Sequence, residues 1–255
     1  MAFFRILKTI FIALLGISFV IVIHEFGHFF AAKTFGVRVP IFSIGFGPEL
    51  FSFYLGGTKF ALSFLLLGGY VSLNPSDLAA QPYFAKMIII LAGIVVNILF
   101  AFIVFKALGI RPKVNIAHPG DSQSSQKNSP EINSEQTDSG KTEITNEEGT
   151  AQKAKRLFSS YDRQFIGPFG IFSLLGKSFE QGFDVFLYLL AILSLNVAIF
   201  NLLPLQFFDG GQALNYTVQA LVGPNLAYLV MRLVNFLLFI FIIIFFMLSG
   251  TKRNR

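Results

Sequence analysis

Two histidines four residues apart provide the clearest potential chemistry in the sequence. His24-Glu25-Phe26-Gly27-His28 follows the apolar residues 10–22 inside one long hydrophobic segment. On a helix, residues four apart lie on the same face, so His24 and His28 can bind one metal ion. Glu25 lies beside that face and can reach a metal-bound water. The H-E-x-x-H spacing is typical of zinc hydrolases with two histidine ligands and a glutamate base.

The alternative is a pair of structural histidines in the core of a helix bundle. The chain contains only three histidines, and two of them form this motif. Ionisable residues inside a membrane segment are costly and usually functional. The setting therefore favours the metal site.

The composition indicates an integral membrane protein. Of the 255 residues, 54% are hydrophobic and 13% are charged, whereas a soluble domain carries about 25% charged residues. The net charge of +6 does not indicate nucleic acid as a partner, because the basic residues lie at the ends and in one polar loop. The chain has no cysteine, which excludes disulfides and cysteine-ligated zinc.

Four apolar stretches are long enough to span a bilayer, which takes about 20 residues. The predicted spans are residues 4–32, 84–108, 183–203 and 226–248. Residues 171–182 predict an amphipathic helix at the membrane interface. In the second span, Ala92-Gly93 permits close helix packing, and the polar Asn97 has either a packing role or an active-site role. The fold class is an α-helical membrane protein of about four spans.

Residues 33–75 predict short strands and hairpins instead of a helix. Alternating, β-branched and aromatic segments are separated by turns such as Gly56-Gly57 and Gly68-Gly69. Non-helical backbone at membrane depth must be buried in protein or line a water cavity. A small membrane-reentrant sheet near the metal meets that condition. Its edge could pair with an extended substrate, or the segment could be an interfacial hairpin without a substrate role.

The polar segment 111–163 divides the chain into two halves, residues 1–110 and 164–255. Each half carries part of the expected catalytic site. Residues 122–150 contain almost no apolar side chains, so we expect disorder there.

A second polar position follows the third predicted span. Pro204 should end the helix, and Asp209-Gly210-Gly211 comes shortly after it. Alone, Asp209 could equally be a third metal ligand or the N-cap of a following helix. Since the histidine pair needs a third ligand, the combination favours a metal ligand.

Taken together, these motifs resemble the site-2 proteases, which are intramembrane zinc metalloproteases, and most closely the bacterial regulator-of-sigma-E type. The resemblance rests on the following stretches, in the family's order: His24-Glu25-Phe26-Gly27-His28, Ala32-Lys33, Phe35-Gly36-Val37, Phe42-Ser43-Ile44-Gly45-Phe46-Gly47-Pro48, Leu67-Gly68-Gly69-Tyr70-Val71, Ala92-Gly93 with Asn97, Gly167-Pro168, and Asn201-Leu202-Leu203-Pro204 with Asp209-Gly210.

The resemblance implies a zinc ion held by His24, His28 and Asp209, with Glu25 as catalytic base. It also implies that Asn201 holds substrate or the oxyanion and that the strands of 38–73 receive unwound substrate. We expect substrate contacts from four residues: Asn201, Gly69, Tyr70 and Asn97. The expected partners are the lipid bilayer and transmembrane protein substrates, such as membrane-anchored regulators or remnant signal peptides.

The sequence departs from the family pattern in three places. Relatives of this type carry PDZ domains between the second and third spans, where this chain has the polar loop. Gln206 replaces the second proline of a P-x-P motif, and Leu66 replaces a proline before Leu-Gly-Gly-Tyr. The two substitutions affect turn rigidity and leave the ligands in place.

Membrane orientation is left open between two signals. The excess of Lys and Arg places both termini and the 106–163 loop in the cytoplasm, whereas the resemblance implies zinc near the cytoplasmic face and the opposite orientation. The expected location is the bacterial cytoplasmic membrane. Two rival functions are an inactive relative that binds transmembrane segments as an adaptor, and a metal transporter; the intact site disfavours the first and the absence of internal repeats the second.

Overall fold

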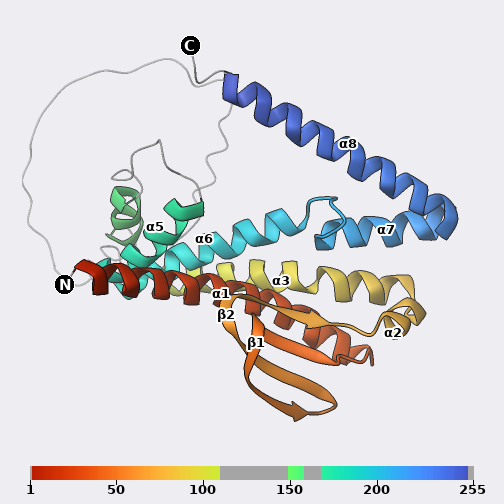
Figure 1. Ribbon diagram of the computed structural model, residues 1–255, viewed down its shortest axis with the longest axis horizontal. Coiled ribbons are helices and arrows are strands. Elements are labelled where there is room, and N and C mark those ends of the chain that lie inside the picture. The colour runs from red at the N-terminus through yellow and green to blue at the C-terminus, as the bar shows by residue number, and fades with distance from the viewer. Residues whose placement is uncertain (1, 110–148, 158–167, 252–255) are drawn as a thin grey trace, which may run out of the picture.

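The computed structural model describes residues 2–109, 149–157 and 168–251. Its elements follow in the order α1 (Ala2–Thr34), β1 (Ile41–Leu55), β2 (Thr58–Ser72), α2 (Pro75–Ala80), α3 (Tyr83–Ala107), α5 (Pro168–Gln181), α6 (Phe183–Asn201), α7 (Asp209–Val222) and α8 (Pro224–Thr251). A further helix covers residues 149–157. Figure 1 shows α1, α3 and α6 side by side, with the strands on one side of α1 and α7 and α8 on the other.

Within the described part of the chain, three helices are long and apolar enough to cross a membrane. They are Phe3–Thr34, Tyr83–Ala107 and Phe183–Asn201, and they match the first three predicted spans. The expected fourth span corresponds to α8, whose described apolar stretch is shorter, at Pro224–Ile240. Large apolar side chains on these helices face outward, as expected for lipid contact. The chain is thus a multi-pass, mostly helical membrane protein, and the last predicted span lies on α8.

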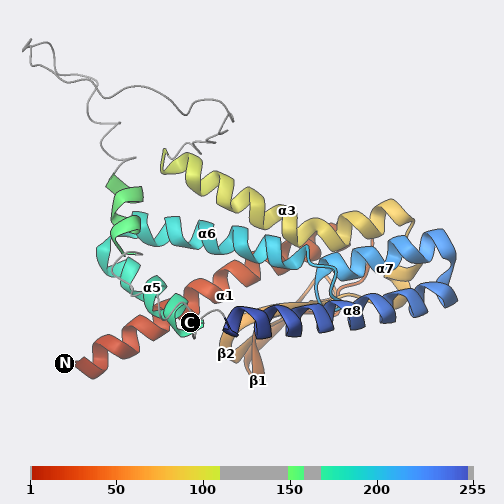
Figure 2. The ribbon, with the colours of Figure 1, turned by 90° about the horizontal axis from the view of Figure 1, so that it is seen from above.

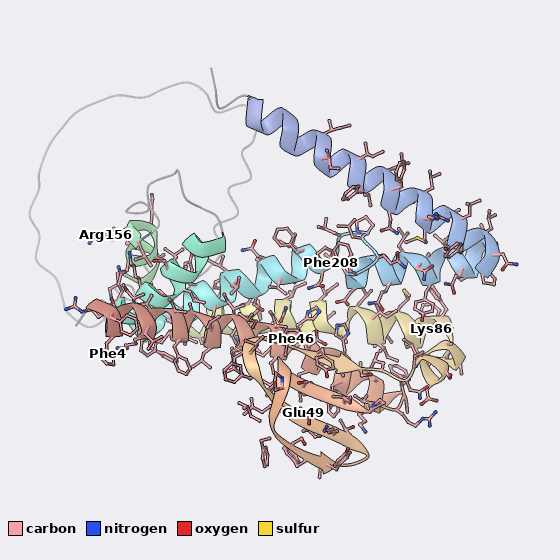
Figure 3. All side chains as sticks on the ribbon, viewed as in Figure 1. Phe4, Phe46, Glu49, Lys86, Arg156 and Phe208 are labelled. Carbon is pink, nitrogen blue, oxygen red and sulfur yellow. The ribbon has the colours of Figure 1, made fainter. Side chains whose placement is uncertain are left out.

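Two basic residues mark the opposite ends of the bundle. Figure 3 labels Arg156 near one end and Lys86 near the opposite end. The ammonium group of Lys86 lies 5.4 Å from the centre of the Tyr216 ring, and the hydroxyl groups of Tyr83 and Thr217 lie 2.9 Å apart. These two contacts join the start of α3 to α7.

The backbones of α1 and α3 touch at a pair of glycines. A Cβ atom on Gly27 would lie 2.6 Å from the carbonyl oxygen of Ala92 and 2.9 Å from the Cα of Gly93. Neither distance is possible for a real side chain, so the crossing requires glycine at position 27. Small residues let membrane helices approach this closely. The prediction of close packing at Ala92-Gly93 is therefore confirmed.

The two strands bend so that four segments lie side by side. Residues 41–44 pair with 69–72 in antiparallel order on one side and with 59–62 on the other, while residues 49–55 form a hairpin with 58–63. Residues 69–72 are thus an edge of the sheet, and this edge lies against α1: the Ser18 hydroxyl donates to the carbonyl of Gly68 over 3.1 Å. Strands at 33–75 were predicted, and the structure has them.

A helix at residues 149–157 lies near the end of the polar segment 111–163, and it overlaps the predicted disorder of 122–150 only at residues 149 and 150. Ala154 and Leu157 are buried, and Leu157 joins the core cluster formed with α1, α5 and α6. The Thr150 hydroxyl donates to Asp184 over 2.7 Å. The few apolar residues are spaced at helical intervals on one face, which composition alone does not reveal. The rest of the predicted loop, residues 111–148 and 158–163, lies outside the described residues.

We predict that Gly27→Ala destabilises the protein, because the added methyl group would push α1 and α3 apart. The expected loss is about 1–3 kcal/mol, the usual cost of overpacking. Thermal unfolding in detergent would measure it. Gly149→Ala is the matched control, since a Cβ there meets nothing within 4 Å. Equal unfolding temperatures for the two variants would contradict the close crossing.

Candidate metal centre

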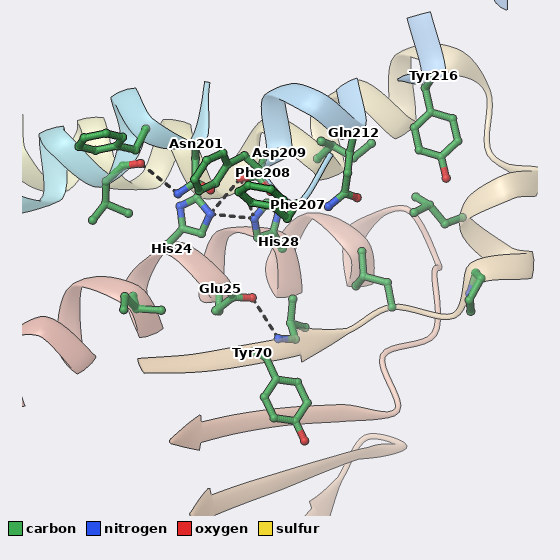
Figure 4. Close-up of a pocket in the computed structure, with 18 of the residues that line it drawn as sticks. His24, Glu25, His28, Tyr70, Asn201, Phe207, Phe208, Asp209, Gln212 and Tyr216 are labelled. Atoms are coloured by element: carbon green, nitrogen blue, oxygen red, sulfur yellow. Dashed lines mark hydrogen bonds and ion pairs between the residues drawn. The ribbon is translucent and has the colours of Figure 1, made fainter. Parts of the chain in front are cut away.

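Two imidazoles from α1 and one carboxylate from α7 meet inside the protein. The Nε2 atoms of His24 and His28 lie 3.2 Å apart. Asp209 Oδ2 lies 2.9 Å from His24 Nε2 and 3.3 Å from His28 Nε2. All three residues are buried. Figure 4 shows both histidines pointing toward Asp209 from α1.

The geometry of these three atoms fits a tetrahedral metal ion. Bonds of about 2.0–2.1 Å to nitrogen and oxygen place the ligand atoms of a tetrahedral site roughly 3.3 Å apart. The observed separations of 2.9, 3.2 and 3.3 Å are close to that edge. Two imidazoles and a carboxylate are a common donor set for catalytic zinc, with the fourth position left for water. The residues present therefore fit a zinc ion.

The position of Asp209 argues against the N-cap alternative for this residue. Helix α7 begins at Asp209 itself, and its N-cap is Phe208. The Asp209 carboxylate does not cap the helix; it faces the two imidazoles. Asp209 thus lies on the first turn of α7, whereas an N-cap residue would precede the helix.

Gly210 and Gly211 allow the backbone of the turn before α7 to pack directly against the first residues of that helix. A Cβ on Gly210 would lie 2.3 Å from the carbonyl oxygen of Leu202, and one on Gly211 would lie 2.0 Å from that of Leu205. Both clashes are with backbone atoms, which cannot rotate away as a side chain would. The Asp-Gly-Gly sequence is therefore needed to bring the carboxylate back to α1.

Gln206 gives this turn an anchor. Its backbone N–H donates to Asn235 Oδ1 of α8 over 3.1 Å. Proline has no N–H and could not make this bond. The departure from the P-x-P pattern is thus accompanied by a hydrogen bond that holds the turn in another way.

The side chain of Glu25 points toward the sheet, away from the face of α1 that carries His24 and His28. Its Oε2 accepts a hydrogen bond of 3.0 Å from the backbone N–H of Val71, at the strand edge (Figure 4). Glu25, the two histidines and Asp209 all line one cavity of about 850 Å³. The carboxylate is therefore oriented by β2 and shares a cavity with the metal centre.

His28 is held in the orientation that a metal ligand needs. Its Nδ1 lies 2.8 Å from the carbonyl oxygen of Ile89 on α3. A carbonyl can only accept, so Nδ1 carries the proton and Nε2 is left with its lone pair. A hydrogen bond of this kind usually fixes the tautomer of a metal-binding histidine.

Gly93 forms the wall of the site on the α3 side. A Cβ there would lie 2.5 Å from His28 Nε2 and 2.7 Å from His24 Nε2. Only a hydrogen atom fits between α3 and the ligand atoms. The same residue that permits close packing thus also leaves room for the two imidazoles.

The four expected substrate-binding residues lie in different surroundings. Asn201 and Tyr70 line the cavity; the Asn201 amide donates to the carbonyl of Val197 over 3.0 Å, and Tyr70 stacks on Phe46. Gly69 is not among the lining residues, and a Cβ there would lie 2.6 Å from the carbonyl of Ser43.

Asn97, the fourth of them, also lies outside the cavity lining. It is fully buried behind His24.

Sequence reasoning missed several residues that line the cavity. Gln212 and Tyr216 belong to this group, and so do the aromatic residues Phe207 and Phe208. Gln212 and Tyr216 lie three and seven positions after Asp209 on α7, which is the spacing of one helix face. That spacing would have placed them beside the third ligand if the helix had been expected to begin at Asp209.

The sequence model of Peptidase family M50 matches residues 12–246. This range includes most of α1, all of α3, α6 and α7, and the three candidate metal ligands. The chain belongs to peptidase family M50. Membership agrees with the resemblance drawn from the motifs.

Individual relatives of the family match shorter stretches. A Helicobacter pylori protein named "Putative zinc metalloprotease" is 43% identical over 113 residues, covering 38% of this chain and 32% of its own. A Borreliella burgdorferi protein of the same name is 39% identical over 111 residues, or 36% and 26% of the two chains. "Membrane metalloprotease ARASP, chloroplastic" of Arabidopsis thaliana is 34% identical over 122 residues, or 42% and 27%. The matches thus span about a third or less of these relatives' length.

We predict that Gly93→Ala weakens zinc binding on the order of 10–100-fold, because the methyl group displaces both imidazoles. Competition with a chelator on the purified protein in detergent would measure the affinity. Val95→Ala is the control on the same helix, since Val95 is 58% exposed and faces away from the site. Equal affinities of the two variants would refute the tight fit of α3 against the ligands.

Proposed function

We propose that this protein is a zinc-dependent endopeptidase that cleaves peptide bonds within or near transmembrane segments of other proteins. The observation that carries the proposal is the convergence of two imidazole nitrogens and a carboxylate oxygen beside Glu25 in one cavity. Membership in family M50 supports a peptidase, and the relatives' names support zinc.

The depth of the site supports a membrane substrate. His24, Glu25 and His28 lie inside Phe3–Thr34, a helix long and apolar enough to span the bilayer. A peptide bond brought to these residues must therefore reach into the membrane region. Single-span proteins, such as membrane-anchored regulators or remnant signal peptides, are the proposed substrates, and the bacterial cytoplasmic membrane is the proposed location.

Zinc at this site would supply a Lewis acid, which polarises a peptide carbonyl and makes a water molecule more acidic. Glu25 then acts as the general base. One of its carboxylate oxygens is held by the Val71 N–H, which leaves the other to accept a proton from the attacking water. Glu25 afterwards delivers that proton to the departing amine, as a base of this kind does in peptide hydrolysis.

The sheet edge beside the cavity suits an extended substrate. Tyr70 and Val71 belong to both the edge and the cavity lining. A helical substrate holds its carbonyls in internal hydrogen bonds and must unwind before attack. A peptide segment that pairs with this edge would be extended and lie next to Glu25.

We predict that Glu25→Gln abolishes cleavage and retains zinc. Loss of a general base costs roughly 100- to 10,000-fold in rate, whereas the ligands are untouched. The measurement is cleavage of a model single-span substrate in detergent, with bound zinc assayed on the same samples. Glu180→Gln is the control, because Glu180 is an exposed residue of α5 outside the cavity.

Each outcome has a distinct meaning. Cleavage by the wild type and by Glu180→Gln, with none by Glu25→Gln, supports the proposal. Undiminished cleavage by Glu25→Gln would refute the role of Glu25. Zinc binding by the wild type without cleavage of any single-span substrate would point instead to an inactive adaptor that binds transmembrane segments.

A further inference from the structure

One face of α3 lies against both histidine ligands. Ile89, Gly93 and Asn97 are spaced four residues apart, so they share that face. Ile89 offers its carbonyl to His28, and Gly93 leaves room for the Nε2 atoms. Asn97 lies next to His24, with its Nδ2 3.3 Å from His24 Nδ1. The three residues together form the wall behind the metal centre.

Asn97 is held in place from the opposite side. The hydroxyl of Ser194 on α6 donates to the backbone carbonyl of Asn97 over 3.0 Å. Asn97 and Ser194 are both fully buried, with 0% of their surface exposed. A chain of polar contacts therefore runs from α6 through α3 to the His24 ring on α1, and neither Asn97 nor Ser194 lines the cavity that would receive substrate.

Metal binding by His24 would require one particular tautomer of its imidazole ring. Its Nε2 faces Asp209 and His28, so Nε2 is the ligand atom. A neutral imidazole that binds a metal through Nε2 carries its proton on Nδ1. That proton needs an acceptor, and burial makes an unpaired N–H costly.

The Asn97 amide can supply that acceptor by rotating. The oxygen and nitrogen of an asparagine amide exchange places when the group turns by 180°. Asn97 Oδ1 is buried and has no hydrogen-bond partner among the described residues. After the rotation Oδ1 occupies the position 3.3 Å from His24 Nδ1 and accepts its proton. An unpaired buried oxygen thus gains a donor.

We propose that Asn97 is a positioning residue for the metal centre, whose amide oxygen accepts the Nδ1 proton of His24 and holds Nε2 toward the metal. The inference rests on the zinc site proposed above and deepens it. It replaces the substrate-binding role expected from the sequence. His28 and His24 are then oriented in the same way from α3, one by a backbone carbonyl and the other by a side-chain amide.

Zinc affinity of the full chain in detergent tests the proposal by chelator competition. Asn97→Leu removes the acceptor and should weaken zinc binding by roughly 10–100-fold. Asn97→Asp keeps an acceptor oxygen and should restore affinity to within a few-fold of wild type. Asn196→Leu is the control, because Asn196 is exposed on α6 and donates to Ile192 of its own helix. A merely structural role would not be rescued by an acidic side chain.

A measurement on the zinc-loaded wild type guards against misfolding of the variants. Nitrogen-detected NMR of the imidazole rings should show two Nδ1 protons protected from exchange, one bonded to Ile89 and one to Asn97. In Asn97→Asp the second signal should shift while the first stays in place. A single protected ring proton would overturn the proposal.

The outcomes separate this inference from the proposed function. Wild-type affinity in a folded Asn97→Leu variant would overturn the positioning role and leave the metal site intact. Loss of affinity in Asn97→Leu with recovery in Asn97→Asp supports the role. Absence of zinc binding by the wild type would overturn both the metal site and this inference.

Discussion

The contact between the backbones of α1 and α3 is the constraint on which the rest of the structure depends. Gly27 leaves no space between the two helices, and Gly93 leaves space only for the ligand atoms. Because the helices are this close, the carbonyl of Ile89 and the amide of Asn97 reach the two imidazoles. At a wider crossing, neither imidazole would have a hydrogen-bond partner on α3, so both rings could rotate. Their Nε2 atoms would then no longer be held toward Asp209.

Polar groups inside the bundle are costly unless each has a partner, and here the partners come from different helices. The Ser194 hydroxyl on α6 donates to α3, and the Ser18 hydroxyl on α1 donates to the strand bend at Gly68. Glu25 is tied to the sheet by Val71. These hydrogen bonds give partners to buried polar groups, which would otherwise be costly in the membrane. The same hydrogen bonds join the helices to one another and to the sheet around the site.

The sequence allowed the spans, the strands and the three candidate metal ligands to be predicted, because apolar length, alternation, the H-E-x-x-H spacing and the Asp-Gly-Gly turn after a span are local signals. It did not reveal the helix at 149–157, whose stability comes from packing against distant residues. It also left Asn97 open, since an amide in a span looks the same whether it contacts substrate or a ligand. It did not show that a helix begins at Asp209 itself, because a glycine pair normally argues against a helix, whereas here the close approach of the preceding backbone requires glycine.

The bond between Gln206 and Asn235 has an evolutionary consequence. Asn235 is useful as an acceptor only while residue 206 has an N–H to donate. A relative with proline at the position of Gln206 has a stiff turn and no donor, so the amide on α8 has nothing to bind there. The two positions should therefore change together across the family, as two exchangeable ways to fix the same turn, although one lies before α7 and the other after it.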